Sequence, residues 1–412
     1  ELAPLVSLLP DNARVSGRLT GRFSSSPTEL DLQFHRVAFG VTPETTIDSI
    51  DGEVGYRNGL LTARNVTVRG ANSDFRLEAR RKEAAWQGAL TGQQLDLNAL
   101  EVFRDGLAAL RARGQPQGSA PQVARPTTGE LTVDVRQLFY RQARFDDVHT
   151  EITIKEGEVA LRNLSARPYT GAIRGTIHAA APTEKGRAVT ANLDLSGIDV
   201  RIIDETAFEN ARGLRGTLDG ILAVSFPLIE DGDPLDHANG RIEFRAANGT
   251  FGKLGIATKL LTALRTTEII QLRLPKLKDE GLAFDTCHGA MVLEDGLMTL
   301  QEFEANNPTL LLTARGTVDF QRDQTDLKFD VSILGAITGL MEVVGLEGTA
   351  RKAQELSSVT LVAVGPPDDP TIRVTKAPAV EQILETVKES EKALREKVKD
   401  AAGDAIRTIL GE

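Results

Sequence analysis

Hydrophobic and polar residues alternate one by one along most of this chain. A period of two is the pattern of β-strands that bury one face and expose the other. Turn residues, mainly Gly, Asn, Asp and Pro, interrupt the alternation about every 8–12 residues, the spacing of antiparallel β proteins. The pattern therefore predicts a mainly β fold, in which an elongated, curled antiparallel sheet of repeated hairpins forms a groove. The clearest strands lie within residues 47–80, 129–195, 216–245, 310–331 and 358–374.

One hairpin pattern occurs three times, at residues Gly52–Val66, Thr150–Leu164 and Gly289–Phe303. In each copy an alternating strand leads into a two-residue turn, and a second alternating strand follows. The turns are Asn58-Gly59, Glu156-Gly157 and Asp295-Gly296. Asn-Gly and Asp-Gly favour the positive φ that tight hairpins require. A repeated unit of this kind indicates an array of neighbours that bury each other's apolar face, so function is expected along its surface.

The tripeptide Arg-Gly-Thr also recurs, starting at Arg174, Arg215 and Arg315, each time in or at the start of a strand. Glycine inside a strand typically marks a bend or a bulge. These glycines are expected to let the sheet curl.

Four segments have the period of an amphipathic or buried helix instead, at residues 97–111, 256–270, 335–344 and 379–410. A run rich in Gly and Pro at residues 113–128 predicts a flexible linker or loop and the one domain boundary. The predicted organisation is an N-terminal β-groove segment at 1–112, this linker, a second β-groove region at 129–376 and a C-terminal amphipathic helix at 377–412. That helix is expected to dock on the body of the protein or on a partner.

The composition narrows the function classes. The 412 residues are 41% hydrophobic and 26% charged, as in a folded protein, and the net charge of −10 argues against a nucleic-acid partner. Aromatic residues make up 5%, so the interior is built mainly from aliphatic side chains. Such an interior suits flexible hydrocarbon better than bases or sugars. The single cysteine, Cys287, cannot form an internal disulfide.

The first residues lack the basic and apolar regions of a signal peptide, and the chain does not begin with Met. We therefore expect a processed protein or a piece of a longer one. The longest nearly apolar run, Val331–Leu346, is too short and too polar to cross a bilayer. A membrane anchor is expected outside these residues.

The sequence contains no recognised motif for catalysis or metal binding. None of the five histidines has a second His, Cys or carboxylate at a metal-binding spacing. Cys287 and His288 are adjacent, but neighbours on a strand face opposite sides. Walker, G-x-S-x-G and dinucleotide-binding loops are missing, and the carboxylates fall at turns or on the outward side of strands. We expect no metal, no cofactor and no enzyme activity.

The apolar side of the strands is then the candidate site. The helices are too few to cover every strand, so part of this side is expected to line a trough for a greasy ligand. The residues predicted to face the groove are Val54, Tyr56, Leu61, Val133, Ile152, Ile154, Val159, Leu161, Ile173, Ile177, Leu193, Leu222, Val224, Met291, Leu293, Met298, Leu300, Leu312, Phe329 and Val331.

Several segments resemble the C-terminal region of the AsmA-like family, which includes TamB and YhdP proteins. They are residues 248–255, 281–285 with the following hairpin, 316–320 and 365–374, and Arg167–Gly171 is similar to the family's "yGG"-type strand, with Thr170 where a Gly is often seen. The resemblance covers roughly residues 130–375 well and 20–110 loosely. It implies a periplasmic protein, anchored in the inner membrane of a diderm bacterium, whose β-groove carries phospholipid between the two membranes.

Three functions compete on these observations. The first is a lipid-transfer conduit that binds phospholipid or other acyl chains, is tethered by an anchor outside this chain and meets inner- or outer-membrane protein partners. The alternative is a non-enzymatic scaffold that assists outer-membrane assembly through protein–protein contacts, which a groove filled by its own side chains would favour. The third is a carbohydrate-active enzyme, which requires carboxylates clustered in one cleft.

Overall fold

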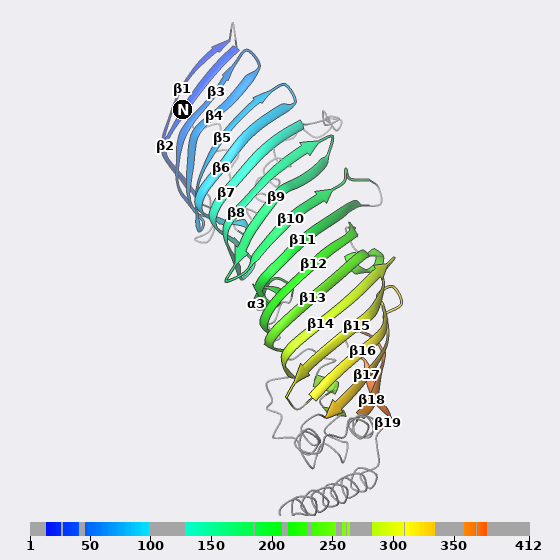
Figure 1. Ribbon diagram of the computed structural model, residues 1–412. Helices are drawn as coiled ribbons and strands as arrows, with labels where there is room; N and C mark the ends of the chain where they lie inside the picture. Colours follow the sequence, from blue (N-terminus) through cyan, green and yellow to red (C-terminus); the bar gives the residue numbers. More distant parts are fainter. Residues whose placement is uncertain are drawn as a thin grey trace, which may run out of the picture. The chain divides into compact units, whose positions relative to one another are not determined.

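The protein is described by a computed structural model (Figure 1). It describes residues 14–25, 28–40, 46–98, 128–183, 186–207, 213–229, 232–252, 258–260, 262–263, 282–308, 310–333, 358–367 and 369–376. The predicted linker, apart from Thr128, and the predicted helices at 335–344 and 379–410 lie outside these residues. The contacts divide the chain into unit 1, Glu1–Ala211 with Leu218–Pro234, and unit 2, Arg212–Thr217 with Leu235–Glu412.

The described residues of unit 1 lie almost entirely in strands. They are β1 (Arg14–Ser25), β2 (Thr28–Gly40), β3 (Ile47–Arg57), β4 (Leu60–Gly70), β5 (Ser73–Lys82), β6 (Ala85–Asp96), β7 (Thr128–Tyr140), β8 (Ala143–Lys155), β9 (Glu158–Pro168), β10 (Ala172–Ala179), β11 (Arg187–Asp199) and most of β12 (Arg215–Leu228). A short helix, α3 (Arg201–Ala207), contacts β8. The prediction of a mainly β fold built of hairpins is confirmed.

From β1 to β11 each strand pairs with the next along the chain. Nine of these ten pairs are antiparallel, and β6 with β7 is the parallel exception, with Ala85 opposite Thr128 and Asp96 opposite Phe139. The alternation of apolar and polar residues predicts antiparallel pairing throughout, which is wrong at this one step. A parallel pair needs a crossover rather than a hairpin, so between Asp96 and Thr128 the chain returns to the edge where β6 begins.

The parallel step brings several turns to one edge of the unit 1 sheet, which we call the hairpin edge. Direct strand pairing joins its residues in one row: Arg57, Leu60, Lys82, Ala85, Thr128, Lys155 and Glu158. The turns of the first two hairpin copies therefore lie along the same edge.

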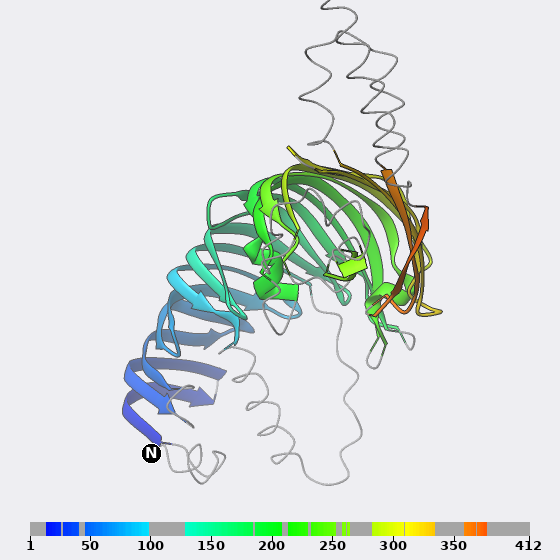
Figure 2. The same cartoon turned by 90° about the horizontal axis from the view of Figure 1, so that it is seen from below.

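The strands of unit 2 are assigned to the same 19-stranded sheet and are strongly curved (Figure 2). Unit 2 contains β13 (Asn239–Thr250), β14 (Ala283–Glu294), β15 (Leu297–Asn307), β16 (Leu310–Asp319), β17 (Gln324–Ile333), β18 (Ser358–Gly365) and β19 (Thr371–Lys376), preceded by the 3₁₀ helix η2 (Pro234–His237). Each strand pairs antiparallel with the next. Of the helix predicted at 256–270, residues 258–260 and 262–263 are described, and they are helical. No helix among the described residues is long and apolar enough to cross a membrane.

The three repeated turns have the predicted geometry. Both residues of each turn have positive φ: 52° and 77° at Asn58-Gly59, 53° and 91° at Glu156-Gly157, and 48° and 80° at Asp295-Gly296. Two successive positive φ angles define the type I′ turn, whose twist matches the twist of the strands that it joins.

Glycines with positive φ also occur inside the strands, at a distance from the turns. The glycines of the three Arg-Gly-Thr tripeptides, Gly175, Gly216 and Gly316, have φ of 150°, 124° and 135°. Gly52 in β3 has φ of 137° and lies opposite Asn65, whose φ is 47°, where the register of β3 and β4 shifts. Residues with a Cβ rarely adopt the backbone angles of these glycines, so the positions require glycine. This geometry agrees with the expectation that these glycines let the sheet curl.

We expect Gly52→Ala to destabilise unit 1 by about 1–3 kcal/mol, because a Cβ would add strain at this φ. That Cβ would also lie 2.7 Å from the Asn65 carbonyl oxygen. Chemical denaturation followed by the fluorescence of Trp86, the one tryptophan, measures the effect. Gly55→Ala in the same strand is the control, since its Cβ would lie 3.1 Å from the Thr62 hydroxyl and 3.9 Å from the nearest backbone atom, the Leu30 oxygen. An equal loss in both variants would contradict the assigned strain.

Candidate binding surface

Strand pairing shows which side chains share a face, because residues directly opposite in a ladder point to the same side of the sheet. In unit 1, Tyr56 of β3 is directly opposite Leu61 of β4. In the same way, Val159 of β9 is directly opposite both Ile154 of β8 and Ala179 of β10. Leu90 in β6 is opposite Val133 in β7, which joins the two halves of the sheet on that side. We call this side of the sheet the apolar face.

All predicted groove residues of β3 to β11 lie on the apolar face of unit 1. They are Val54, Tyr56, Leu61, Val133, Ile152, Ile154, Val159, Leu161, Ile173, Ile177 and Leu193. Leu222 and Val224 are two residues apart on β12 and therefore point to the same side of that strand. Contact of these residues with a ligand stays a prediction.

The predicted groove residues of unit 1 are mostly half-buried, and buried side chains of the same face lie at Val135, Val148 and Val189. Of these thirteen side chains, Val133 alone is buried, and Leu61 is 39% exposed. The buried cluster of Leu95, Val133 and Val135 is small, with partly buried neighbours such as Phe75 and Leu90. The described part of unit 1 thus presents accessible aliphatic surface along several strands.

The apolar face of unit 2 is packed more tightly. The register again places the predicted residues on one side: Met291, Leu293, Met298, Leu300, Leu312, Phe329 and Val331. Met291 and Met298 are half-buried, and the other five are buried. All of them except Leu293 belong to or border a continuous cluster that includes Leu361 and Ala363 of β18, both with 0% exposure.

Aromatic rings fill part of this cluster. The ring of Phe251, just after β13, lies 4.7 Å from that of Phe284 and 6.0 Å from that of Phe303, centroid to centroid. Phe244 of β13 is 6.5 Å from Phe303 in the same way. Tilted pairs at these distances are favourable packing contacts. The side chains that cover the apolar face of unit 2 therefore come from this chain.

Cys287 belongs to the same cluster, and the reactivity of its thiol can be used to measure how tightly the cluster is packed. The thiol is 2% exposed, and burial raises its pKa to about 12. Because the thiolate is the reactive form, we expect iodoacetamide at pH 8 to alkylate the native chain at least ~1,000-fold more slowly than the urea-unfolded chain. Mass spectrometry of timed samples gives the two rates. Similar rates would mean that the cluster opens readily.

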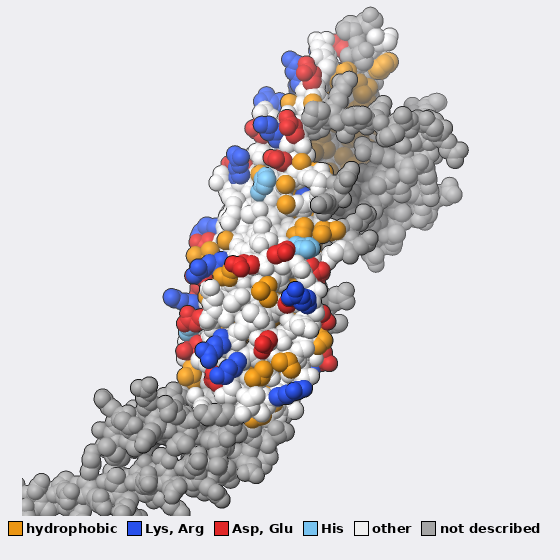
Figure 3. Space-filling model, turned by 90° about the vertical axis from the view of Figure 1, so that its right-hand side faces the viewer, with side chains coloured by type: hydrophobic (Ala, Val, Ile, Leu, Met, Phe, Trp, Pro, Cys, Tyr) orange, Lys and Arg blue, Asp and Glu red, His pale blue; other side chains and the backbone are white. Residues whose placement is uncertain are grey.

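The opposite face of the unit 1 sheet is polar and charged. Glu151, Arg162 and Thr132 are paired across three strands and exposed or half-buried. On the surface turned to the viewer in Figure 3, acidic and basic side chains are interspersed and hydrophobic ones occur singly or in small groups. This is the solvated face that the alternation predicts.

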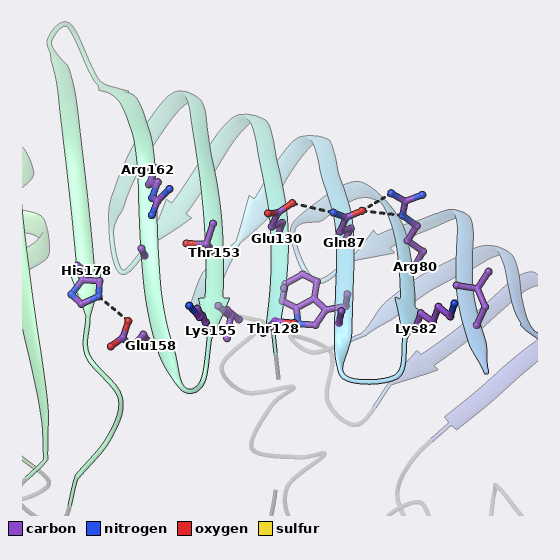
Figure 4. Close-up of a pocket in the computed structure, with 16 residues that line it drawn as sticks. Arg80, Lys82, Gln87, Thr128, Glu130, Thr153, Lys155, Glu158, Arg162 and His178 are labelled. Atoms are coloured by element: carbon purple, nitrogen blue, oxygen red, sulfur yellow. Dashed lines mark hydrogen bonds and ion pairs between the residues drawn. The ribbon is translucent and has the colours of Figure 1, made fainter. Parts of the chain in front are cut away.

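A cavity of about 760 Å³ lies near the hairpin edge (Figure 4). Across it, Arg80 Nε donates to Gln87 Oε1 at 3.1 Å, and Gln87 Nε2 donates to Glu130 Oε2 at 3.1 Å. His178 Nε2 is 3.7 Å from Glu158 Oε2. Alternation alone did not predict this cavity, because its shape depends on the twist of several strands. Its paired charges of both signs fit a solvated sheet face.

A row on the polar face has the residue types of a hydrolase triad. Asp134, His149 and Ser165 are directly opposite one another on β7, β8 and β9, and His149 Nδ1 lies 2.6 Å from Asp134 Oδ1. All three residues lie on the polar face of the sheet, where a carboxylate and an imidazole pair as ordinary cross-strand neighbours. Among the described residues, no group of three His, Cys, Asp or Glu side chains could hold a metal ion.

Three turns of unit 2 are joined by one polar cluster. Gln321 Nε2 donates to the backbone oxygens of Asp236, at 2.8 Å, and Asp295, at 2.9 Å. His237 Nδ1 lies 2.9 Å from Asp295 Oδ1, and because an ionised carboxylate only accepts hydrogen bonds, the ring nitrogen is the donor. This contact holds the pKa of Asp295 below its usual value. The cluster fixes neighbouring hairpins at one edge of unit 2.

Comparison with known proteins places these features in a family. A family model described as "YhdP protein" matches residues 61–350. "Protein AsmA" of Escherichia coli (strain K12) is 20% identical over 285 residues, which cover 62% of this chain and 43% of that protein. The chain thus spans less than half the length of this relative. No solved structure matches the chain.

Proposed function

The chain belongs to the YhdP family, and from that premise we propose that its apolar face binds the acyl chains of phospholipid and supports lipid transport between the inner and outer membranes. The observation that carries the proposal is the accessible face of unit 1, where aliphatic side chains of neighbouring strands lie in register and are only half-buried. The resemblance to AsmA-like proteins implies the same class of cargo.

The dimensions of the face suit acyl chains. Strands in a sheet are about 4.8 Å apart, so the ten pairings from β1 to β11 give a surface on the order of 50 Å across the strands. Each methylene removed from water against it contributes roughly 0.8 kcal/mol. Polar head groups can remain in water, which avoids the cost of burying them. Sliding along such a surface requires no cofactor and no catalytic group.

The proposal includes a location. A lipid carrier between two membranes works in the periplasm, tethered to the inner membrane by an anchor outside these residues and meeting membrane proteins at its ends. The matches to YhdP and AsmA proteins support an envelope role. We expect no nucleic-acid partner, because the chain carries a net charge of −10.

The test is direct. Purified chain is extracted with organic solvent, and the extract is examined for phospholipid by mass spectrometry. A phospholipid with a photoactivatable diazirine in its acyl chain is then offered to delipidated protein. We expect co-purifying phospholipid and covalent adducts after illumination. Absence of both would refute the proposal.

One observation favours the second candidate, a scaffold for outer-membrane assembly. The apolar face of unit 2 is filled by side chains of its own chain. A protein partner would therefore contact unit 2 through its polar face and its sheet edges. A scaffold role predicts a stable protein partner in cross-linked envelopes and no requirement for lipid.

A further inference from the structure

The two units differ in how completely their apolar faces are covered. Among the predicted groove residues, one of thirteen is buried in unit 1, whereas five of seven are buried in unit 2. The difference is sharpest in β17 and β18, where Val331, Val359 and Leu361 have 0% exposure. An acyl chain has no free apolar surface to contact there.

The cover includes a helical turn between β13 and β14. Leu260 is 4% exposed within the unit 2 cluster, and Ala263, three residues further along the same helical side, packs against the cluster. Thr258 and Thr262 on the other side are exposed, with Thr262 Oγ1 donating to the Thr258 carbonyl at 2.9 Å. The turn therefore presents its apolar side to the sheet.

A charged contact holds this helical turn at the far end of the ladder. Lys259 Nζ donates to the backbone oxygen of Pro370 at 2.7 Å and lies 2.5 Å from a carboxylate oxygen of Asp369. Asp369 and Pro370 directly precede β19, the last strand of the ladder, whereas Lys259 follows β13, the first. The curved ladder of β13 to β19 is thus bridged from its first strand to its last by the element that covers it.

We infer that the apolar face of unit 2 excludes acyl chains, so that lipid bound by this chain lies against unit 1. The inference rests on the proposed function. To enter unit 2, a hydrocarbon chain would have to displace side chains of the cluster to which Leu260 and Phe284 belong, and it would replace apolar contacts that already exist. Entry therefore gains little hydrophobic energy, whereas the half-buried face of unit 1 still exposes apolar surface that an acyl chain can remove from water.

The experiment uses the native chain and phosphatidylethanolamine that carries a diazirine in its acyl chain. After illumination and digestion, mass spectrometry compares adducts on peptides of β8–β10 with those of β16–β18. We expect adducts on β8–β10 and background on β16–β18. Adducts on both sets would overturn the inference and leave the proposed function standing. Adducts on neither would refute the proposed function and this inference with it.

Leu260→Asp tests the part assigned to the helical turn, because a carboxylate is poorly tolerated inside an apolar cluster. We expect adducts on β16–β18 to rise above background in this variant while β8–β10 stay unchanged. Thr262→Asp, on the exposed side of the same turn, is the matched control and should leave the pattern native. Background labelling in Leu260→Asp would show that this turn is not what keeps the lipid out.

Amide hydrogen exchange of β17 is measured alongside. If the amides of β17 lose protection from exchange in Leu260→Asp, the labelling experiment is done with Leu260→Ala instead. This variant removes the covering side chain without adding a charge. Labelling of β16–β18 in Leu260→Ala supports the assignment, and background labelling contradicts it.

Discussion

Ile154→Asp is expected to remove most of the phospholipid that the chain binds, whereas Glu151→Lys leaves binding close to native. Ile154 is half-buried on the apolar face, paired with Gly129 and Val159. An acyl chain against the new carboxylate would strip it of water, which costs more than the roughly 2–7 kcal/mol of an uncharged polar group. A loss of even ~3 kcal/mol lowers affinity more than a hundredfold.

The comparison depends on the facing of the two side chains. Glu151 is exposed, lies opposite Arg162 and points to the polar face, so a change of its charge does not touch the acyl site. Quantified lipid extraction from both variants gives the result, with melting curves as a check that both fold. Equal loading of the two variants would contradict the assigned faces, and with them the binding surface itself.

Leu361→Ala is expected to lower the free energy of unfolding of unit 2 by about 2–5 kcal/mol, the range for deleting a buried leucine side chain. Leu361 has 0% exposure and lies between Phe329 of β17 and Val374 of β19. Amide hydrogen exchange of β16–β18, measured by mass spectrometry, reports the change in the unit where it occurs.

Two controls separate this effect from general damage. Leu297→Ala removes a leucine of the same unit that is 38% exposed, and such surface changes usually cost within ~0.5 kcal/mol. The fluorescence of Trp86, in β6 of unit 1, should keep its native denaturation midpoint in both variants. An exchange pattern for Leu361→Ala like that of Leu297→Ala would show that the cluster is loosely packed.

Local features of the fold could be predicted from the sequence because they depend on short stretches of chain. The two-residue turns follow from Asn-Gly, Asp-Gly and Glu-Gly pairs, and the facing of Ile152 and Ile154 follows from alternation. β6 was not predicted. Its apolar side reads Trp86, Gly88, Leu90, Gly92, and the glycines weaken the alternation. Around Gly316 the alternation predicts two strands, Leu310–Ala314 and Thr317–Phe320, where the structure has the single strand β16.

The difference between the units could not be predicted from these patterns. Ile152 and Ile154 in unit 1 alternate with polar residues in the same way as Phe329 and Val331 in unit 2. Whether such a face is covered depends on elements distant in the sequence, such as Leu260 over the unit 2 cluster. Alternation specifies which side chains share a face, and only tertiary packing decides what lies against that face.

The parallel pair of β6 and β7 has a consequence for how such a chain can grow. In an uninterrupted antiparallel meander, successive turns lie alternately on the two rims of the sheet. Two hairpins that are separated by five strands would therefore have their turns on opposite rims. β3–β4 and β8–β9 are five strands apart and yet turn on the same rim, because one step between them does not reverse direction. The number of strands in a duplicated segment therefore matters. If a segment with an odd number of strands is duplicated, the two copies have their turns on the same rim only when the segment includes one parallel crossover.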